Sequence, residues 1–211
     1  GTIRLNYDFY AGMHEVTFAD YGHYCAETGA GKPADYGWGR EDRPVVNVSW
    51  TNAVEYANWL SRKEGLEEAY EADKSATGGY KLKKSLEELE GYRLLTSTEW
   101  DYTASGGKDS RASLYAGKKL EEIGWYMKNS DGKTQPVGQL MPNRLGVYDM
   151  MGNVSEWVND TDGYGFCYYH GSSWYQSAQS SQISFRSVKL PSDRPNSIGF
   201  RIARTKIPAG R

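Results

Sequence analysis

Residues 145–157 read Leu-Gly-Val-Tyr-Asp-Met-Met-Gly-Asn-Val-Ser-Glu-Trp, and this stretch decides the fold. Gly152 suits a turn where a side chain would not fit, because glycine reaches left-handed backbone conformations at little cost. Trp157 is predicted to fill a space in the core with its large ring. From Gly124 onward the pattern is short strands, turns and aromatics, and the whole chain holds 24 Gly, 17 Tyr and 7 Trp. This composition predicts a loop-rich mixed fold held by aromatic rings and glycine turns.

Three segments before this stretch have helical patterns. Residues 17–29 begin with a capping threonine and end with a glycine, and their apolar residues share one face. Residues 51–65 form the clearest helix, with apolar residues at i, i+3, i+4 and i+7 and a glycine at the end. A third, short helix begins at the Thr-x-x-Glu capping box of residues 96–99 and ends at the glycine pair 106–107.

The remaining segments before residue 124 are less regular. Residues 44–48 read Pro-Val-Val-Asn-Val, which is typical of a strand. Residues 66–91 are charged and have no clean period, so they are interpreted as a surface excursion with a short helix at 85–89. Because no internal repeat or linker is present, residues 1–211 are predicted to form a single domain.

Several other side chains are predicted to be structural. The five tryptophans expected in the core are Trp50, Trp59, Trp100, Trp157 and Trp174. Arg93, Glu99 and Arg201 are expected in buried, hydrogen-bonded pairs, because charges persist inside a protein only with partners. Cys25 and Cys167 are too few for a disulfide framework and are expected to be free thiols.

Composition also limits the partners. The net charge is −2 and no Lys/Arg block stands out, so no nucleic-acid partner is expected. No apolar run approaches the roughly 20 residues that span a bilayer, so we predict no membrane span in this chain. The chain does not begin with Met, so a processing step can have removed a targeting segment, and the residues alone leave localisation unknown.

Short motifs along nearly the whole chain resemble those of one family, the formylglycine-generating-enzyme (sulfatase-modifying factor) domains. They are EVT at 15–17, PVVNVSW at 44–50, GYRLLTSTEW at 91–100, PVG at 136–138, LGVYDMMGNVSEW at 145–157, GSSW at 171–174 and IGFR at 198–201. The resemblance implies an α+β, C-type lectin-like fold of the formylglycine-generating-enzyme type. Such a fold is loop-rich, with short antiparallel strands and two to three helices.

The enzymes of this family oxidise a cysteine with a copper ion held by two cysteines near the C-terminus. Counted back from IGFR, those positions fall near Gln182 and Ser187, and no cysteine follows residue 167. Neither residue replaces a thiolate as a Cu(I) ligand. The iron-dependent branch needs a histidine-rich site, whereas this chain has only His14, His23 and His170 at spacings that do not chelate. We therefore predict that the chain is not an enzyme and requires no cofactor.

A structural calcium ion is the one metal that the resemblance implies. Carried over, Asp149 and Glu156 would supply carboxylates, and Gly152 and Val154 would supply backbone carbonyls. Oxygen ligands of this kind suit Ca²⁺. The alternative is a turn held by hydrogen bonds alone.

Residues 162–198 differ in composition from the rest of the chain. They hold nine serines and four tyrosines but five charged residues, and Tyr, Ser, Gly and Asn dominate adaptable recognition loops. The segment also resembles the variable region of diversity-generating-retroelement proteins, in which miscopied adenines turn Asn codons into Tyr, Ser, Asp and others. The predicted ligand-binding residues are Tyr164, Phe166, Tyr168, Tyr169, Tyr175, Gln176, Ser177, Asp193, Pro195, Asn196 and Ser197. Trp174, Arg186, Arg194 and Phe200 are expected to be framework.

Three functional hypotheses follow. The first is a non-catalytic protein with a diversified C-terminal recognition surface, displayed at the cell surface or secreted as the resemblance implies. The second is a pseudoenzyme or accessory domain of the same family with one fixed partner, and the third is an enzyme of unrecognised chemistry. In the first two the ligand is an unidentified macromolecule, a protein or a glycan.

Overall fold

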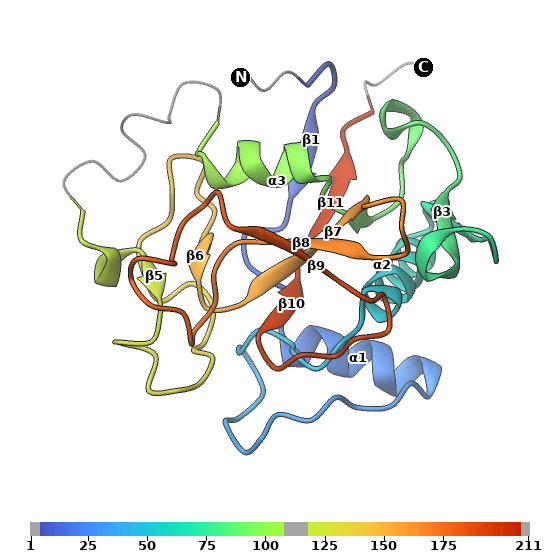
Figure 1. The fold of residues 1–211 in the computed structure, drawn as a ribbon. Helices are drawn as coiled ribbons and strands as arrows, with labels where there is room; N and C mark the ends of the chain where they lie inside the picture. The colour runs from blue at the N-terminus through green and yellow to red at the C-terminus, as the bar shows by residue number, and fades with distance from the viewer. Residues whose placement is uncertain (1–4, 108–117, 208–211) are drawn as a thin grey trace.

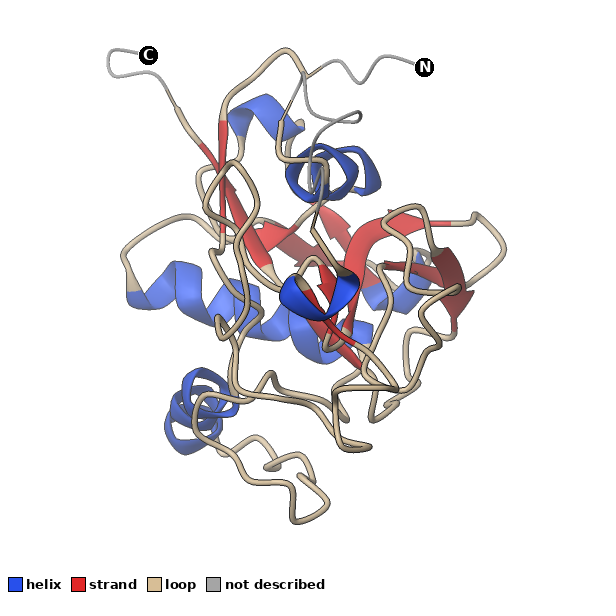
Figure 2. Ribbon diagram, turned by 90° about the vertical axis from the view of Figure 1, so that its left-hand side faces the viewer, coloured by secondary structure: helices blue, strands red, loops and turns tan. Residues whose placement is uncertain are grey.

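The computed structural model describes residues 5–107 and 118–207, which Figure 1 traces from blue to red. Its α-helices are α1 (Phe18–Thr28), α2 (Trp50–Lys63) and α3 (Ser97–Ala104), and its 3₁₀ helices are η1 (Thr77–Gly79), η2 (Leu86–Glu88) and η3 (Leu120–Glu122). The strands are β1 (Phe9–Ala11), β2 (Tyr70–Ala72), β3 (Tyr80–Leu82), β4 (Arg93–Leu94), β5 (Gly124–Trp125), β6 (Met151–Gly152), β7 (Ser155–Thr161), β8 (Cys167–His170), β9 (Arg186–Lys189), β10 (Ile198–Phe200) and β11 (Ile202–Thr205). Figure 2 shows that loops connect most of these short elements.

A four-stranded sheet with the order β10-β7-β8-β9 lies at the centre. β10 pairs with β7 in parallel, while β7–β8 and β8–β9 are antiparallel. Figure 1 shows α3 above this sheet and α1 below it. Because side chains alternate along a strand, Trp157 joins the apolar cluster that contains α1 and α2, and Val158 joins the cluster that contains α3. β7 thus separates two cores.

A second sheet has the order β1-β11-β4. β1 pairs with β11 in antiparallel and aligns Phe9 with Thr205, so strands from the two ends of the chain lie side by side. The smaller pairs are the antiparallel β2–β3 and the parallel β5–β6. Gly152 in β6 passes so close to Trp125 that an added Cβ would lie 2.0 Å from its carbonyl oxygen, which confirms the need for glycine there.

The three predicted helices are confirmed, and local signals set their ends. Thr17 and Asp20 form a capping box on α1, and Gly29 ends that helix at φ +75°. Ser49 caps α2, which starts one residue earlier than predicted, and Thr96 caps α3 through the predicted capping box. Each cap satisfies backbone N–H groups that a helix start leaves without partners.

Two predicted segments differ. Residues 44–48 are buried but do not form a strand, because the N–H of Val45 bonds to Val16 whereas that of Asn47 bonds to Pro195, on a different segment. Asn47 also has φ +60°, which breaks an extended run. Residues 66–91 are more than a surface excursion, since they contain the β2–β3 hairpin and its buried Tyr70. The short helix predicted at 85–89 is present as η2.

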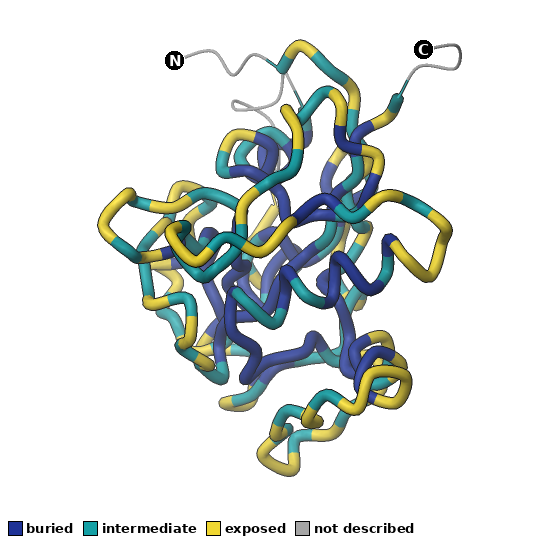
Figure 3. Tube along the Cα trace, turned by 90° about the vertical axis from the view of Figure 1, so that its right-hand side faces the viewer, coloured by how far each residue is buried: buried dark blue, intermediate teal, exposed yellow. Residues whose placement is uncertain are grey.

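Most of the predicted core is confirmed, and Figure 3 shows the buried segments inside a shell of exposed loops. Trp50, Trp59, Trp100 and Trp157 are buried. The indole N–H of Trp50 donates to Val158 O (2.8 Å) and that of Trp157 donates to Val48 O (3.1 Å), so the two rings tie α2 and residues 44–48 to β7. Trp174 is the exception, because it is only half-buried.

The predicted charged residues form two buried ion pairs. The Arg93 guanidinium donates to both oxygens of Glu99, each at 2.7 Å. Arg201 pairs with Glu156, its Nη2 lying 2.8 Å from Oε1. Both pairs are almost completely buried, so removing one partner of either pair would leave an uncompensated charge in the core.

Candidate recognition surface

The 162–198 segment does not form one continuous surface. The turn between β7 and β8 carries Tyr164, which is 88% exposed, and Phe166. The Asp162 carboxylate accepts the N–H groups of both residues at 2.8 and 3.0 Å and holds the turn. The loop with Tyr175 follows β8 and therefore leaves the opposite end of this hairpin. The predicted ligand-binding residues thus divide between two ends of the central sheet.

Tyr168 and Tyr169 on β8 support the sheet more than they face solvent. As neighbours on one strand they point to opposite faces, and each packs against a different apolar cluster. The Tyr169 ring lies edge-on to Trp157 with a centroid distance of 5.9 Å. Both tyrosines are only partly exposed, so we reassign them to the framework.

Trp174 and Tyr175 belong to a surface group of four rings, which we call the aromatic patch: Tyr36, Trp38, Trp174 and Tyr175. Successive ring centroids lie 5.4, 5.2 and 5.4 Å apart in that order. Tyr36 is 59% exposed and Tyr175 is 51% exposed, while the two tryptophans between them are half-buried. The patch therefore offers a continuous aromatic face with its two ends open to solvent.

Backbone contacts hold the C-terminal half of the patch from several segments. The N–H of Trp174 donates to Asn153 O (2.8 Å), and its carbonyl accepts from the Ser130 hydroxyl (2.8 Å). Its indole N–H donates to Asn196 O at 3.1 Å. The carbonyl of Gln176 accepts from Met127 N at 3.0 Å. The half-buried Trp174 is thus fixed in place, which pre-organises a binding surface.

Asn47 links the Tyr36 end of the patch to the loop that leads into β10. Its side-chain amide donates to Ala34 O (2.6 Å), its side-chain oxygen accepts from the Tyr36 hydroxyl (3.2 Å), and its backbone N–H donates to Pro195 O (3.0 Å). In Figure 1 the loop that follows α1 runs beside the loop that leads into β10. One asparagine in a left-handed conformation therefore fixes both loops.

The other predicted binding residues contribute in different ways. Asp193, Pro195 and Asn196 are partly exposed, and Ser197 is buried with its carbonyl accepting from Ser155 N. Ser177 bonds to Ser180 and shapes the turn after the patch.

Sequence reasoning missed Tyr36 and Trp38, and misplaced some framework residues. The available signal was the run Asp-Tyr-Gly-Trp-Gly at 35–39, where exposed aromatics alternate with glycines. Of the predicted framework, Phe200 is buried, whereas Arg186 and Arg194 are exposed. Trp174 is both a framework residue and a member of the aromatic patch.

The predicted calcium ligands lie in a buried charged cluster beneath the GNVSEW turn. Glu156 accepts from Arg201 through both oxygens and from the Trp100 indole at 2.8 Å. Asp149 Oδ2 accepts from Gly138 N at 2.7 Å, and Glu15, which sequence reasoning did not single out, lies in the same cluster. Gly152 lies in β6, and Val154 lies in the core.

In this cluster Glu156 is already paired with Arg201, whereas both Glu15 carboxylate oxygens and Asp149 Oδ1 are buried without hydrogen-bond partners among the described residues, so the calcium ion stays a prediction. Burial raises the pKa of Asp149 to about 6, and burial followed by the charge of Asp149 raises the pKa of Glu15 well above its usual range. The Arg201 guanidinium already occupies the Glu156 carboxylate, and a cation beside it would be repelled. Among residues 5–107 and 118–207 no group of three or more His, Cys, Asp or Glu side chains is arranged to hold a metal ion.

The two thiols are both buried and free, as predicted. Burial raises the pKa of the Cys167 thiol to about 12, and it raises that of Cys25 as well. Of the two positions where copper ligands were sought, Gln182 is exposed on the loop before β9, and Ser187 lies in β9 opposite Tyr169.

Comparison with known proteins gives the family. The sulfatase-modifying factor enzyme 1-like domain matches residues 2–206, almost the full length of the chain. The chain belongs to this family. It has the α+β, C-type lectin-like fold of the formylglycine-generating-enzyme type, with short strands and three α-helices in its described part.

Three relatives of this sulfatase-modifying factor-like chain are informative. Chaperone protein LppX of Paenibacillus barcinonensis is 32% identical over 94% of this chain and 81% of LppX. The inactive C-alpha-formylglycine-generating enzyme 2 of Mus musculus is 28% identical over 82% of this chain, which spans about half (53%) of that protein. The solved Treponema denticola variable protein 1 is 29% identical with a TM-score of 0.71, covering 94% of this chain and 84% of that one. The family therefore includes inactive and variable members.

None of the helices in the described ranges is long and apolar enough to cross a membrane.

Proposed function

We propose that this chain is a non-catalytic binding protein whose ligand-facing surface is the aromatic patch together with the partly exposed residues beside it. Those residues are Gln176, Ser177, Asp193, Pro195 and Asn196. The observation that carries the proposal is the row of four rings in tilted or edge-on contact, open to solvent at both ends and anchored by backbone bonds. Large, rigid aromatic side chains give contact area at a low entropy cost, and they dominate the energetics of recognition surfaces.

The chemistry of the chain supports a non-catalytic role. Thiolates bind Cu(I), whereas a thiol whose pKa is far above neutrality stays protonated. Both cysteines are of that kind, and the positions near Gln182 and Ser187 carry no sulfur. The histidines are dispersed: His14 contacts the Tyr148 ring at a tilt, His23 is exposed on α1, and His170 is buried beside Trp100.

Diversification of the 162–198 segment is the finer part of the proposal. Its support is the similarity to Treponema denticola variable protein 1 and the Tyr- and Ser-rich composition of the segment. Tyr164, Tyr175, Gln176 and Asn196 are on loops, where side chains can change without disturbing the core. The partner would be a macromolecule, a protein or a glycan, met at the cell surface or outside the cell.

A fixed-partner accessory role is the second candidate. The identity to the LppX chaperone along nearly the whole chain favours it. In that case the same patch would contact one partner, and residues 162–198 would not vary between copies of the gene.

Panning tests the binding surface. The immobilised chain is exposed to a glycan array and to a phage-displayed random peptide library, and each hit is retested on the Tyr36→Ala/Tyr175→Ala variant. We expect binding to weaken at least about tenfold, as for loss of interface aromatics. Tyr10→Ala is the matched control, because Tyr10 is 57% exposed on β1 and makes no contact with the patch rings. Equal binding by all three proteins would refute the proposed surface.

A further inference from the structure

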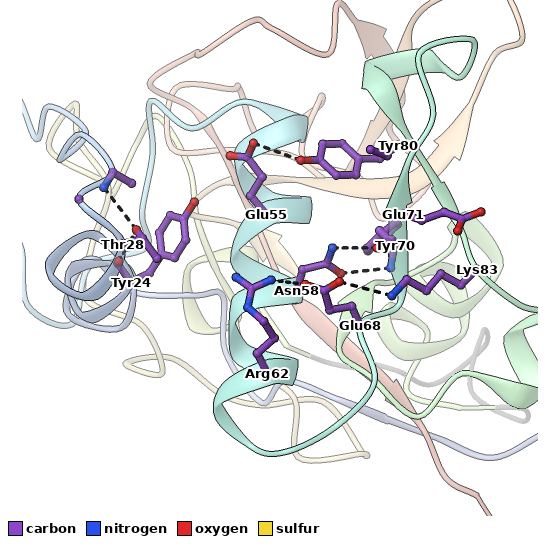
Figure 4. Close-up of a pocket in the computed structure, with 13 residues that line it drawn as sticks. Tyr24, Thr28, Glu55, Asn58, Arg62, Glu68, Tyr70, Glu71, Tyr80 and Lys83 are labelled. Atoms are coloured by element: carbon purple, nitrogen blue, oxygen red, sulfur yellow. Dashed lines mark hydrogen bonds and ion pairs between the residues drawn. The ribbon is translucent and has the colours of Figure 1, made fainter.

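A second hollow lies on different elements from the aromatic patch, between α1, α2 and the β2–β3 hairpin (Figure 4). Its volume is about 780 Å³, within the range of small-molecule pockets. The residues that carry its chemistry are Tyr24, Glu55, Asn58, Arg62, Glu68 and Tyr80. Neither the family resemblance nor the proposed recognition surface uses this pocket.

The two basic side chains in the lining share one partner. Arg62 and Lys83 both bond to the Glu68 carboxylate, Lys83 at 3.3 Å, and Figure 4 shows the three groups together. Glu71 at the rim pairs instead with Lys81 at 3.4 Å. Asn58 is also engaged, because its side chain bonds to both backbone groups of Tyr70. These polar groups of the lining already have protein partners.

Glu55 differs from them. Within the described part of the chain no Lys, Arg or His nitrogen lies within 4.0 Å of its carboxylate. It accepts only from neutral donors at long distances, the Tyr80 hydroxyl at 3.4 Å and the Asn52 amide at 3.5 Å. Glu55 is half-buried, and Figure 4 shows it between the rings of Tyr24 and Tyr80. A partly desolvated carboxylate without a counterion attracts a cation.

The electrostatic effect of Glu55 on its neighbours agrees with this geometry. Burial first, and then the Glu55 charge, raises the pKa of Tyr24 to about 12. The pKa of Tyr80 is raised by the same two causes in the same order. Both phenols therefore stay neutral, and the partly exposed Tyr80 ring can hold a cation or its alkyl stem by contact with its π face.

We propose that this pocket binds an ammonium or guanidinium group on an alkyl stem. Glu55 pairs with the charge, and the partly exposed Tyr80 ring lies beside the stem. The cation belongs to a ligand, because the basic residues of the lining are held by Glu68. Two sources share this chemistry, a free organic amine and a Lys or Arg side chain of a polypeptide.

The test is an NMR titration of the ¹⁵N-labelled chain with three probes. Agmatine represents a free amine, N-acetyl-lysine methylamide represents a polypeptide side chain, and N-acetyl-norleucine methylamide is the uncharged counterpart. We expect saturable shifts of the backbone signals around Glu55, Asn58 and Tyr80 with at least one cationic probe below about 10 mM. The better-bound cation identifies the source of the ligand.

Matched variants locate the charge. Glu55→Gln should weaken binding of that probe about tenfold or more, whereas Glu71→Gln, at the rim of the same pocket, should change it less than about twofold. Both residues are solvent-accessible, so thermal unfolding should show that both variants fold. The proposal is overturned by no saturable shift with either cation, by equal binding of the norleucine probe, or by unchanged binding in Glu55→Gln.

Discussion

Among single residues, Asn47 has the most consequences for the proposed recognition surface. It adopts φ +60°, and its side chain and backbone bond to Ala34, Tyr36 and Pro195. Asparagine tolerates this left-handed conformation better than most residues. The same side chain that suits the backbone therefore holds the loop that carries Tyr36, while its backbone N–H holds the loop that leads into β10.

Substituting Asn47 should separate these two effects. Asn47→Gly keeps the left-handed backbone and loses the side-chain bonds, so the free energy of unfolding should fall by about 1–2 kcal/mol. Asn47→Ala adds backbone strain and should cost about 1 kcal/mol more. Urea denaturation measures both. The control is Asn6→Ala, which removes an exposed hydrogen bond to Glu87 and should change the free energy of unfolding by less than about 0.5 kcal/mol. If Asn6→Ala lowered this free energy as much as the Asn47 variants do, Asn47 would have no special role.

Asp149 should give the protein a distinctive dependence on pH. Its folded pKa of about 6 lies above its ordinary value of 3.8, mainly because it is buried. The folded state therefore binds this proton more tightly than the unfolded state does. The resulting stabilisation is complete below about pH 4 and is lost as the pH rises through about 6, with a total of about 3 kcal/mol at most.

Asp149→Asn removes this titration, and asparagine also suits the φ of +59° at this position. As the pH rises from 4 to 8, we expect the melting temperature of the variant to increase relative to that of the parent. Thermal unfolding at pH 4, 5, 6, 7 and 8 measures the difference between the two proteins. A difference that stays constant over this range would show that Asp149 is not protonated in the folded state.

At the level of elements, the β7–β8 hairpin separates replaceable side chains from structural ones. Tyr164 and Phe166 lie in the turn, where Asp162 accepts the backbone N–H groups and no side-chain packing is needed. Tyr169, three residues further on, packs against Trp157 and Phe185. A position in the turn or in the strand therefore decides which tyrosines of the hairpin can be replaced without loss of packing.

Serine substitutions test this division. Tyr164→Ser should change the free energy of unfolding by less than about 0.5 kcal/mol, as for most surface sites. Tyr169→Ser should lower it by about 2–4 kcal/mol, because it leaves a space beside the Trp157 ring. Chemical denaturation of both variants provides the comparison. Similar values for the two would contradict the assignment of Tyr169 to the framework.

Local signals explain which elements could be predicted from the sequence. The capping residues Thr17 and Thr96 act on N–H groups three residues away, and the apolar periodicity of residues 51–65 is equally local, so the helices were recognisable without knowledge of the tertiary structure. Residues 44–48 were predicted wrongly because their backbone partners come from two distant segments. Of the aromatic patch only Tyr175 was predicted as a binding residue for the same reason, since Trp38 and Trp174 meet only in the folded chain.

For the molecule as a whole, two buried ion pairs lie at the centre. Arg201 neutralises Glu156 between the two cores, and Arg93 neutralises Glu99 below α3. Because each of these pairs satisfies its own carboxylate, neither Glu156 nor Glu99 needs a cation to compensate its charge. Calcium should therefore contribute little to the stability of this chain.

Thermal unfolding in calcium chloride and in EGTA checks this expectation. A ligand that binds the folded state at 100 times its dissociation constant adds about 2.7 kcal/mol, which shifts the midpoint of a chain of this size by several degrees. We expect the two midpoints to agree within about 1 °C. A higher midpoint in calcium that Glu156→Gln abolishes would restore the calcium site that the family resemblance implies.

Sequencing the DNA around the gene tests the proposed diversification most directly. A diversified binder predicts a near-copy of the last part of the gene, differing mainly at adenines, beside a reverse-transcriptase gene. The variable codons should fall at Tyr164, Tyr175, Gln176, Ser177, Asp193 or Asn196, while those of Tyr169, Trp174 and Phe200 stay fixed. The absence of both the near-copy and the reverse transcriptase would contradict diversification and leave the same surface to a single, fixed partner.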